Sequence, residues 1–133
     1  MGLNDTDRAT LVKMYWERCC SILAEVDVAI ANSCWYAAAN RIYYAVFYAV
    51  SALFIKDGYP VKSHRGAKNV LNKEYVLTGR IDVESAHFFA ELESLRDAAD
   101  YNVFFQATEE EIMEYRPMVD TFISDIKNLI GEI

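Results

Sequence analysis

The sequence predicts an all-α protein, built as an up-down bundle of four to five helices. Apolar residues recur at three- and four-residue steps along most of the 133 residues, and no stretch alternates with the period of two that strands show. Prolines, glycines and helix-capping residues fall between these periodic stretches. With 53% hydrophobic residues and only two prolines, the composition indicates a compact core and excludes disordered and low-complexity proteins. We expect one domain over residues 1–133.

The first two predicted helices are joined by a short break. The first runs from about Asp7 to about Ala31 and carries one apolar stripe. Ser33 lies in the break and is expected to cap a second helix, which ends near Lys56. A Gly-Tyr-Pro turn at residues 58–60 then ends this second helix.

The second helix is apolar around nearly its whole circumference, which is typical either of the centre of a bundle or of a membrane span. Asn40 and Arg41 lie within it, and a charge inside hydrocarbon is costly. No second hydrophobic span accompanies this helix in the sequence. We therefore predict that it is the central core helix, that the protein does not enter a membrane, and that Arg41 has a carboxylate or a ligand as partner.

Two more helices are predicted in the second half of the chain, before the last one. Ser63 is expected to cap a helix from His64 to Glu74, which residues 75–79 close. The next helix is expected to begin near Asp82, its capping residue, and to end before a loop over residues 102–107.

The last helix is expected to begin at a capping box. Thr108 and Glu111 have the spacing of this motif, in which each side chain bonds the backbone of the other residue. Pro117 lies inside the same periodic stretch. Because proline lacks a backbone donor, we expect a kink or a break there.

Charge is unevenly distributed along the chain. The net charge of −7 disfavours nucleic-acid binding by bulk electrostatics. Residues 56–80 carry a net charge of +4, however, whereas residues 81–133 carry −10. The basic segment has two interpretations: an exposed loop and short helix with ordinary surface lysines, or a local face that binds an anion or a partner.

The three cysteines, Cys19, Cys20 and Cys34, have neither the spacing of a disulfide framework nor that of a zinc site. We interpret them as small buried apolar residues in a reducing compartment. The N-terminal residues lack the basic and then apolar layout of a signal peptide. We therefore expect a cytoplasmic protein.

Most sequence signatures of enzymes are missing. The sequence has no glycine-rich phosphate loop and no His-x-x-x-His pair. Glu84 and His87 have the three-residue spacing found in di-iron bundles, but that design needs a second such pair and further glutamates on facing helices. We therefore expect neither a metal site nor a cofactor.

One segment, at the end of the fourth predicted helix, has residues suited to binding a phosphate. Arg96 offers a planar guanidinium fork, and Tyr101 supplies a hydroxyl at the helix end. The alternative is a surface arginine that pairs locally with Glu93 and Asp100. Such pairs contribute only roughly a few tenths of a kcal/mol.

Four short motifs follow one another along the chain: Trp35-Tyr36, Asn40-Arg41-x-Tyr43-Tyr44-Ala45-x-Phe47-Tyr48, Ser63-His64 and Leu95-Arg96-x-x-Ala99-Asp100-Tyr101. In their order and spacing they resemble the HEPN domain family, whose members are small prokaryotic helical bundles often encoded beside a minimal nucleotidyltransferase. The resemblance spans nearly the whole chain. It implies a homodimer with a cleft between the two copies, a nucleotidyltransferase partner and, in many members, metal-independent ribonuclease activity.

The residues that this resemblance implies for catalysis are only partly present. The ribonuclease signature of the family is an arginine, a polar residue, a few more residues and then a histidine. Arg96 matches the arginine and Asp97 the polar residue, but Tyr101 stands in the position of the histidine. In members whose motif extends to a tyrosine, the partner nucleotidyltransferase can modify that residue. Here Val103 stands in its place.

The missing histidine weakens the case for cleavage of RNA. The reaction needs a base for the 2′-hydroxyl, and a phenol with a pKa of about 10 is a weak base at pH 7. His64 could substitute from another helix, because it begins a helix in the basic segment. The alternative is that His64 is a turn residue beside the Ser63 cap.

Three functions remain open, and the sequence favours the first. It is a module that binds a nucleotide, an RNA phosphate or a nucleotidyltransferase, in a toxin–antitoxin type of cassette and without efficient RNA cleavage. The second is an active metal-independent endoribonuclease toxin, with Arg96 and Tyr101 as catalytic candidates. The third is a structural protein-interaction module. The candidate binding residues are Arg96, Asp97, Asp100, Tyr101, Asn40, Arg41, Tyr44 and His64.

Overall fold

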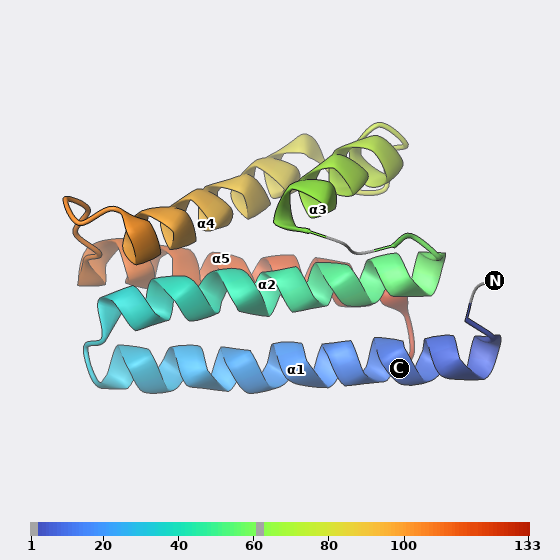
Figure 1. Ribbon diagram of the computed structural model, residues 1–133, viewed down its shortest axis with the longest axis horizontal. Helices are drawn as coiled ribbons and strands as arrows, with labels where there is room; N and C mark the ends of the chain where they lie inside the picture. The colour runs from blue at the N-terminus through green and yellow to red at the C-terminus, as the bar shows by residue number, and fades with distance from the viewer. Residues whose placement is uncertain (1–2, 61–62) are drawn as a thin grey trace.

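The computed structural model describes residues 3–60 and 63–133, and within these residues the chain forms helices and no strand. The helices are α1 (Asp5–Ala31), α2 (Trp35–Asp57), α3 (His64–Val70), the π-helical segment η1 (Leu71–Val76), α4 (Val83–Tyr101) and α5 (Glu109–Ile130). Figure 1 shows that the four long helices alternate in direction along the chain. The predicted all-α, up-down bundle is confirmed.

Helix α2 is the central helix of this bundle. It packs against α1, α4 and α5, and its small buried alanines allow these neighbours to approach closely. The helix is long and apolar enough to cross a membrane, with a mean hydropathy of 1.3, but 67% of the apolar stretch is buried inside the bundle. This burial accounts for the apolar circumference seen in the sequence.

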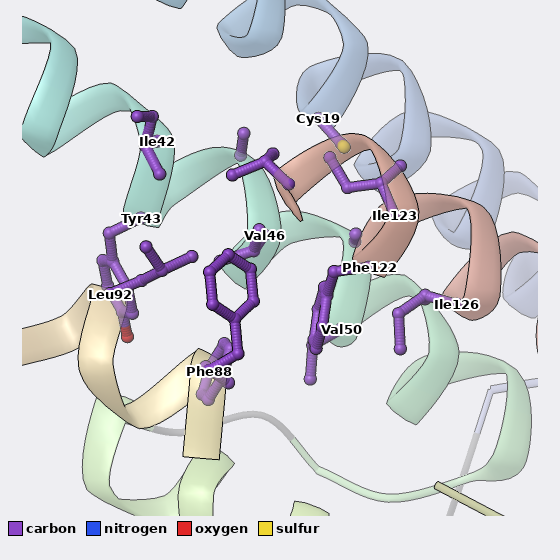
Figure 2. Packing of buried hydrophobic residues seen from close by; sticks show 14 of the residues in the cluster. Cys19, Ile42, Tyr43, Val46, Val50, Phe88, Leu92, Phe122, Ile123 and Ile126 are labelled. Carbon is purple, nitrogen blue, oxygen red and sulfur yellow. The ribbon is translucent and has the colours of Figure 1, made fainter. Parts of the chain in front are cut away.

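Side chains from α1, α2, α4 and α5 meet in one apolar core (Figure 2). Phe89 of α4 is fully buried and stacks with Phe122 of α5, with the ring centroids 6.2 Å apart. The ring of Tyr43, on α2, lies 5.8 Å from that of Phe89. Burying a side chain such as Phe89 contributes about 1.5–3 kcal/mol. These contacts fix the positions of α2 and α4 relative to each other.

The connection between α1 and α2 differs from the prediction. Ser33 does not cap α2, which begins at Trp35 after Cys34, a residue whose side chain makes no capping bond. The backbone of Ser33 has a φ of +56°, in the left-handed region, and its N–H donates to the carbonyl of Ile30 at 3.0 Å. Ser33 therefore closes the end of α1 instead of starting the next helix.

The helix after Ser63 is longer than predicted. As expected, the Ser63 hydroxyl accepts a hydrogen bond from the Gly66 N–H at 3.0 Å. The chain then passes from α3 into η1 and stays helical to Val76, two residues beyond Glu74. Tyr75, predicted to lie in the closing turn, is completely buried, and its ring stacks with that of Phe54 at 5.5 Å.

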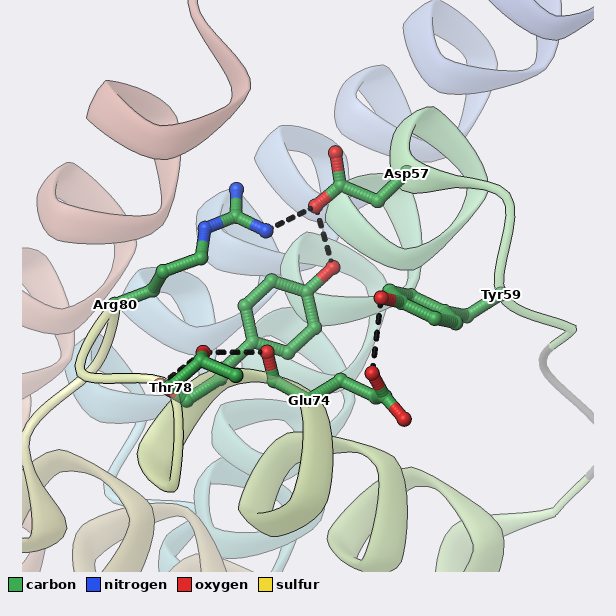
Figure 3. Close-up of polar contacts among 6 residues, drawn as sticks. Asp57, Tyr59, Glu74, Thr78 and Arg80 are labelled. Carbon is green, nitrogen blue, oxygen red and sulfur yellow. Dashed lines mark hydrogen bonds and ion pairs between the residues drawn. The ribbon is translucent and has the colours of Figure 1, made fainter.

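A cluster of polar contacts ties η1 and the following turn to the end of α2 (Figure 3). Asp57 accepts hydrogen bonds from the Tyr75 hydroxyl at 2.6 Å and from Arg80 Nη1 at 2.9 Å. Tyr59 donates to Glu74 at 3.0 Å. Burial and the neighbouring Asp57 carboxylate raise the pKa of Tyr75. Its hydroxyl is therefore a protonated donor at neutral pH, and the cluster holds α3 and η1 against the bundle.

Asp82 and Thr108 cap the last two helices as predicted, but the return bond from the Thr108 N–H to the Glu111 side chain is not formed among the described residues, so the capping box is half complete. The break at Pro117 is absent. Asp82 accepts from the Ser85 N–H at 2.8 Å, and Thr108 accepts from the Glu111 N–H at 3.2 Å. Helix α5 continues through Pro117 without interruption. Pro117 is exposed, so the carbonyl that loses its intrahelical donor can be hydrated.

The prediction of three buried cysteines is correct for one of them. Cys19 is completely buried, and burial raises the pKa of its thiol to about 12. Cys20 and Cys34 are exposed. Cys20 is displaced by about 100° around α1 from its buried neighbour, and Cys34 lies in the turn between α1 and α2, where there is no core to bury it.

Candidate functional site

The eight candidate binding residues predicted from the sequence come together on one face of the bundle. Three helices contribute them: Asn40, Arg41 and Tyr44 lie on α2, His64 on α3, and Arg96, Asp97, Asp100 and Tyr101 on α4. We call this set the Arg96 cluster. Tyr44 is central to it, because its ring packs near His64 and against the guanidinium groups of both Arg41 and Arg96.

The Arg96 guanidinium is held among aromatic rings. Its central carbon lies 5.3 Å, 5.6 Å and 6.0 Å from the ring centroids of Tyr43, Tyr44 and Tyr101. The residue is only 8% exposed. Contacts of this kind stabilise an arginine and restrict the orientation of its planar fork.

The hydrogen bonds of Arg96 differ from a local pairing with Glu93 and Asp100. Its Nη2 forms an ion pair with Asp97 at 2.8 Å, and its Nη1 donates to the Tyr44 hydroxyl at 3.4 Å. The Nε atom is buried and has no hydrogen-bond partner within the described part of the chain. Neither Glu93 nor Asp100 forms an ion pair with Arg96 there. The guanidinium is thus buried, with one free donor and one exposed carboxylate as its charged partner.

His64 lies beside this arginine, although the two residues are far apart in the sequence. Its Nδ1 is 2.8 Å from the hydroxyl of Tyr43, and its ring packs against Phe47 with centroids 4.7 Å apart. Burial lowers the pKa of the imidazole below its usual value, and Arg96 lowers it further, while Glu93 and Asp97 act in the opposite direction. The imidazole is therefore mainly neutral at pH 7.

A buried carboxylate orients His64 through Tyr43. Glu93 is buried, forms an ion pair with Lys68 at 3.0 Å and accepts a hydrogen bond from the Tyr43 hydroxyl at 3.2 Å. Burial, followed by the charge of Glu93, raises the pKa of Tyr43, so its hydroxyl stays protonated. Because this single proton goes to the carboxylate, the hydroxyl oxygen accepts from Nδ1–H of His64. The Nε2 atom then carries the lone pair.

Sequence reasoning did not assign Tyr43, Glu93 or Lys68 to the site. A signal existed for Glu93, which precedes Arg96 by one helical turn and therefore shares its helix face. Tyr43 was hidden in an aromatic run, where a core residue and a polar contact look alike. No local pattern joins Lys68 to Glu93, because that ion pair depends on how α3 packs on α4.

A second chain of polar contacts within the cluster joins α2 to α4 and α1. Arg41 donates to the Asn40 side-chain oxygen from Nε at 2.9 Å and from Nη2 at 2.7 Å, and pairs with Glu25 at 3.3 Å. Asn40 in turn donates to Asp100 at 2.9 Å. The carboxylate partner expected for Arg41 is therefore Glu25, on α1.

The basic segment does not present its charge as one free patch. Lys68 pairs with Glu93, and Arg80 pairs with Asp57 at 2.9 Å. Lys62 lies outside the described residues. The positive charge of this segment is partly neutralised inside the fold, which favours the interpretation as an ordinary loop and short helix over a separate anion-binding face.

An apolar loop adjoins the Arg96 cluster at the end of α4. Tyr101 is 76% exposed, and Val103 and Phe104 are 91% and 92% exposed. Isolated exposed apolar residues are ordinary, but three of them within four positions form a patch that favours contact with another chain.

Comparison with known proteins agrees with the resemblance seen in the motifs. The sequence profile described as the HEPN domain matches residues 12–129. A protein of Thermotoga maritima named "UPF0332 protein" is 31% identical over 120 residues, which cover 90% of this chain and 91% of the relative. A protein of Methanocaldococcus jannaschii named "Putative toxin MJ0142" is 35% identical over 74 residues, which cover 56% of this chain and 50% of the relative.

Proposed function

Because the chain belongs to the HEPN domain family, we propose that it is an RNA-binding module whose binding face is the Arg96 cluster. The observation that carries the proposal is the state of Arg96. Its guanidinium is buried and oriented by rings, yet its charged partner is the 53% exposed carboxylate of Asp97. Arg116, the other largely buried arginine of the ion pairs, also has exposed partners, but it uses all three of its nitrogens in bonds to Asp27 and Asp120. Arg96 differs because its Nε has no partner among the described residues, which leaves a donor for a ligand.

A phosphate can replace Asp97 at little cost. The carboxylate side chain is 53% exposed, so water can solvate it when it is released, and the phosphate takes over the charge-assisted bond that it made to Arg96. The phosphate gains a preoriented fork in a poorly hydrated environment, where charge-assisted bonds are strong. The free Nε donor of Arg96 would gain a partner in the same step.

The cellular role that we propose is that of the toxin component of a two-component cassette. Support comes from the relative named "Putative toxin MJ0142". A cytoplasmic location is the one that would suit the proposed RNA target. A minimal nucleotidyltransferase is the partner that fits this role.

Binding of RNA by the unmodified chain is the first test of the proposal. We expect a labelled single-stranded RNA of about 12 nucleotides to bind saturably at low salt, with a dissociation constant of roughly 100 µM or lower. Affinity should fall as salt rises, because phosphate contacts release counterions. Fluorescence anisotropy measures both the dissociation constant and its dependence on salt. An anisotropy that stays flat up to millimolar protein would contradict the proposal.

A second copy of the chain is the partner that fits the apolar loop. Two loops that pair would remove Val103 and Phe104 from water and bring two Arg96 clusters to one cleft. We expect the chain to sediment as a dimer and Phe104→Ser to sediment as a monomer with unchanged helicity. Leu77→Ser, at a residue that is also 81% exposed but lies after η1, is the matched control and should remain dimeric. A monomeric unmodified chain would exclude this pairing.

Cleavage of RNA is a second candidate function, and the position of His64 favours it. The imidazole lies beside Arg96, is mainly neutral, and has its Nε2 lone pair free of partners among the described residues. These are the properties of a general base. His64 would thus supply the general base that Tyr101, in the position of the family's histidine, cannot supply.

The reaction that this arrangement fits needs no metal. His64 Nε2 takes the proton of a ribose 2′-hydroxyl, the 2′-oxygen bonds to the adjacent phosphorus, and the bond from phosphorus to the 5′-oxygen breaks. Arg96 stabilises the charge on the phosphoryl oxygens. The leaving 5′-oxygen takes a proton from water, so the products are a 2′,3′-cyclic phosphate and a 5′-hydroxyl. Incubation of labelled RNA with the protein in EDTA tests for these two ends.

A further inference from the structure

A cavity of about 300 Å³ lies between α1 and α2, next to the Arg96 cluster. Its polar lining comes from both helices: Arg18, Ser21 and Glu25 from α1, and Arg41, Tyr44 and Tyr48 from α2. Tyr44 is shared by the Arg96 cluster and this cavity, because its hydroxyl accepts a hydrogen bond from Arg96 and its side chain lines the cavity. The cavity and the cluster are therefore neighbours on one continuous surface.

Two arginines in this cavity are oriented by aromatic rings. The Arg18 guanidinium lies 5.8 Å from the Tyr48 ring centroid, and the Arg41 guanidinium lies 5.2 Å from that of Tyr44. The planar fork of Arg18 makes no hydrogen bond among the described residues and suits the oxygens of a phosphate, which accept bonds from two nitrogens at once. Arg41 already bonds Asn40 and Glu25 with its three nitrogens, so it contributes mainly its positive charge. The cavity also offers the hydroxyls of Ser21, Tyr44 and Tyr48 as further donors.

The charges of the cavity are not balanced within the fold. Its single carboxylate, Glu25, pairs with Arg41 at 3.3 Å. Arg18 forms no ion pair with any residue in the described ranges, and its side chain is exposed. In a chain with a net charge of −7, a concave site with two guanidinium groups and one acid is locally positive. A bound anion would neutralise this positive charge.

We propose that this cavity is a second phosphate subsite, which takes the phosphate group of a nucleotide next to the one bound at Arg96. The inference rests on the proposed function, because it extends the RNA path from the α2–α4 face onto α1. Arg18 would bond the phosphate oxygens, Arg41 would add positive charge beside them, and Tyr44 would separate the two subsites. Free nucleotides carry the same phosphate chemistry, so the test compares the two sources.

Substitution of Arg18 tests the subsite without disturbing the fold, because this residue is exposed and its one described contact is with the Tyr48 ring. We expect Arg18→Gln to weaken binding of single-stranded RNA about fivefold. It should also reduce the slope of log affinity against log salt by about 0.7, the value for one lost phosphate contact on a single strand. Lys13→Gln, which removes the same charge from an exposed position on α1 outside the cavity, should change neither quantity.

Two further arms identify the source of the phosphate. Adenosine monophosphate and inorganic phosphate are titrated against the unmodified chain and Arg18→Gln. If adenosine monophosphate or inorganic phosphate binds weakly and Arg18→Gln abolishes that binding, the subsite belongs to free phosphates. If Arg18→Gln weakens the binding of RNA alone, the subsite belongs to the RNA chain. Either result supports the subsite. Ser21→Asp, which adds a negative charge inside the cavity, should weaken the same ligand at least as much.

The outcomes separate this inference from the proposed function. If RNA binds and depends on Arg96, but Arg18→Gln and Lys13→Gln have equal effects, the subsite is wrong and the proposed function stands. If RNA does not bind, the proposed function is wrong, and the subsite survives only through binding of free phosphate that requires Arg18. If none of the three ligands binds, both are overturned.

Discussion

Substitution of Arg96 by Ala is expected to reduce the affinity of the chain for single-stranded RNA by about tenfold or more. A hydrogen bond to a charged group contributes about 1.5–3 kcal/mol, and about 1.4 kcal/mol corresponds to a factor of ten. Fluorescence anisotropy at low salt measures the loss. Arg96→Lys keeps the positive charge but not the fork, so we expect it to recover only part of the affinity.

The fold must be measured alongside binding, because Arg96 is also packed among rings. Removing its side chain leaves space beside Tyr43, Tyr44 and Tyr101 and is expected to lower the free energy of unfolding by about 1–3 kcal/mol. Urea unfolding followed by circular dichroism gives this value. If folded Arg96→Ala binds RNA as tightly as the unmodified chain, Arg96 is a structural residue and the proposed binding face is wrong.

Arg116 offers a matched control for this substitution. It is also an ion-paired arginine with a largely buried side chain, 16% exposed, and it bonds Asp27 at 2.9 Å and Asp120 at 2.6 Å. These partners lie on α1 and α5, away from the residues of the Arg96 cluster. Arg116→Ala should therefore lower stability without the tenfold loss of RNA affinity.

Substitution of His64 by Ala is expected to slow RNA cleavage in EDTA by about 100-fold or more, the usual contribution of a general base. The rate should also depend on pH in a defined direction. A base acts when it is neutral, and the pKa of His64 is lowered from its usual value of 6.5. The rate is therefore expected to stay level from about pH 8 to about 6.5 and to fall below that, as the imidazole becomes protonated.

Two variants separate a catalytic role of His64 from a structural one. His87→Ala removes the other histidine, which is exposed on α4, and should leave the rate unchanged. Tyr43→Phe keeps the buried ring and removes the hydroxyl that orients Nδ1, so we expect a smaller loss of rate at nearly unchanged RNA affinity. RNA that remains intact with the unmodified chain, or equal rates for His64→Ala and the unmodified chain, would exclude cleavage by His64.

The helices could be predicted from the sequence because their signals are local. Asp82 and Thr108 are capping residues that bond backbone donors three positions later, and this geometry depends on a few neighbouring residues alone. The prediction was wrong at Ser33, and of the kink or break expected at Pro117 the break is absent. Ser33 adopts a left-handed backbone conformation that closes α1, so it does not serve as the cap of α2. At Pro117 the packing of α5 outweighs the loss of one backbone hydrogen bond.

The site could be predicted only as a set of residue types. The motifs supplied all eight members of the Arg96 cluster, His64 included, but nothing in the sequence placed His64 beside Arg96. That position follows from the packing of α3 across α2, which the aromatic contacts of His64 with Tyr43, Tyr44 and Phe47 hold in place. Contacts between residues on different helices leave no periodic trace in a sequence.

The amino-acid order alone determines the class of fold, the helical periods, most of the caps and the family. The periods and the caps depend on neighbours within about one or two helical turns, and the family resemblance depends on the order of short motifs along the chain. The packed bundle decides which charges are buried: Arg96 becomes an enclosed guanidinium, Glu93 a buried carboxylate, and His64 a neutral imidazole beside them. Burial and electrostatic potential are sums over groups that are distant in the chain, so only the tertiary structure sets them.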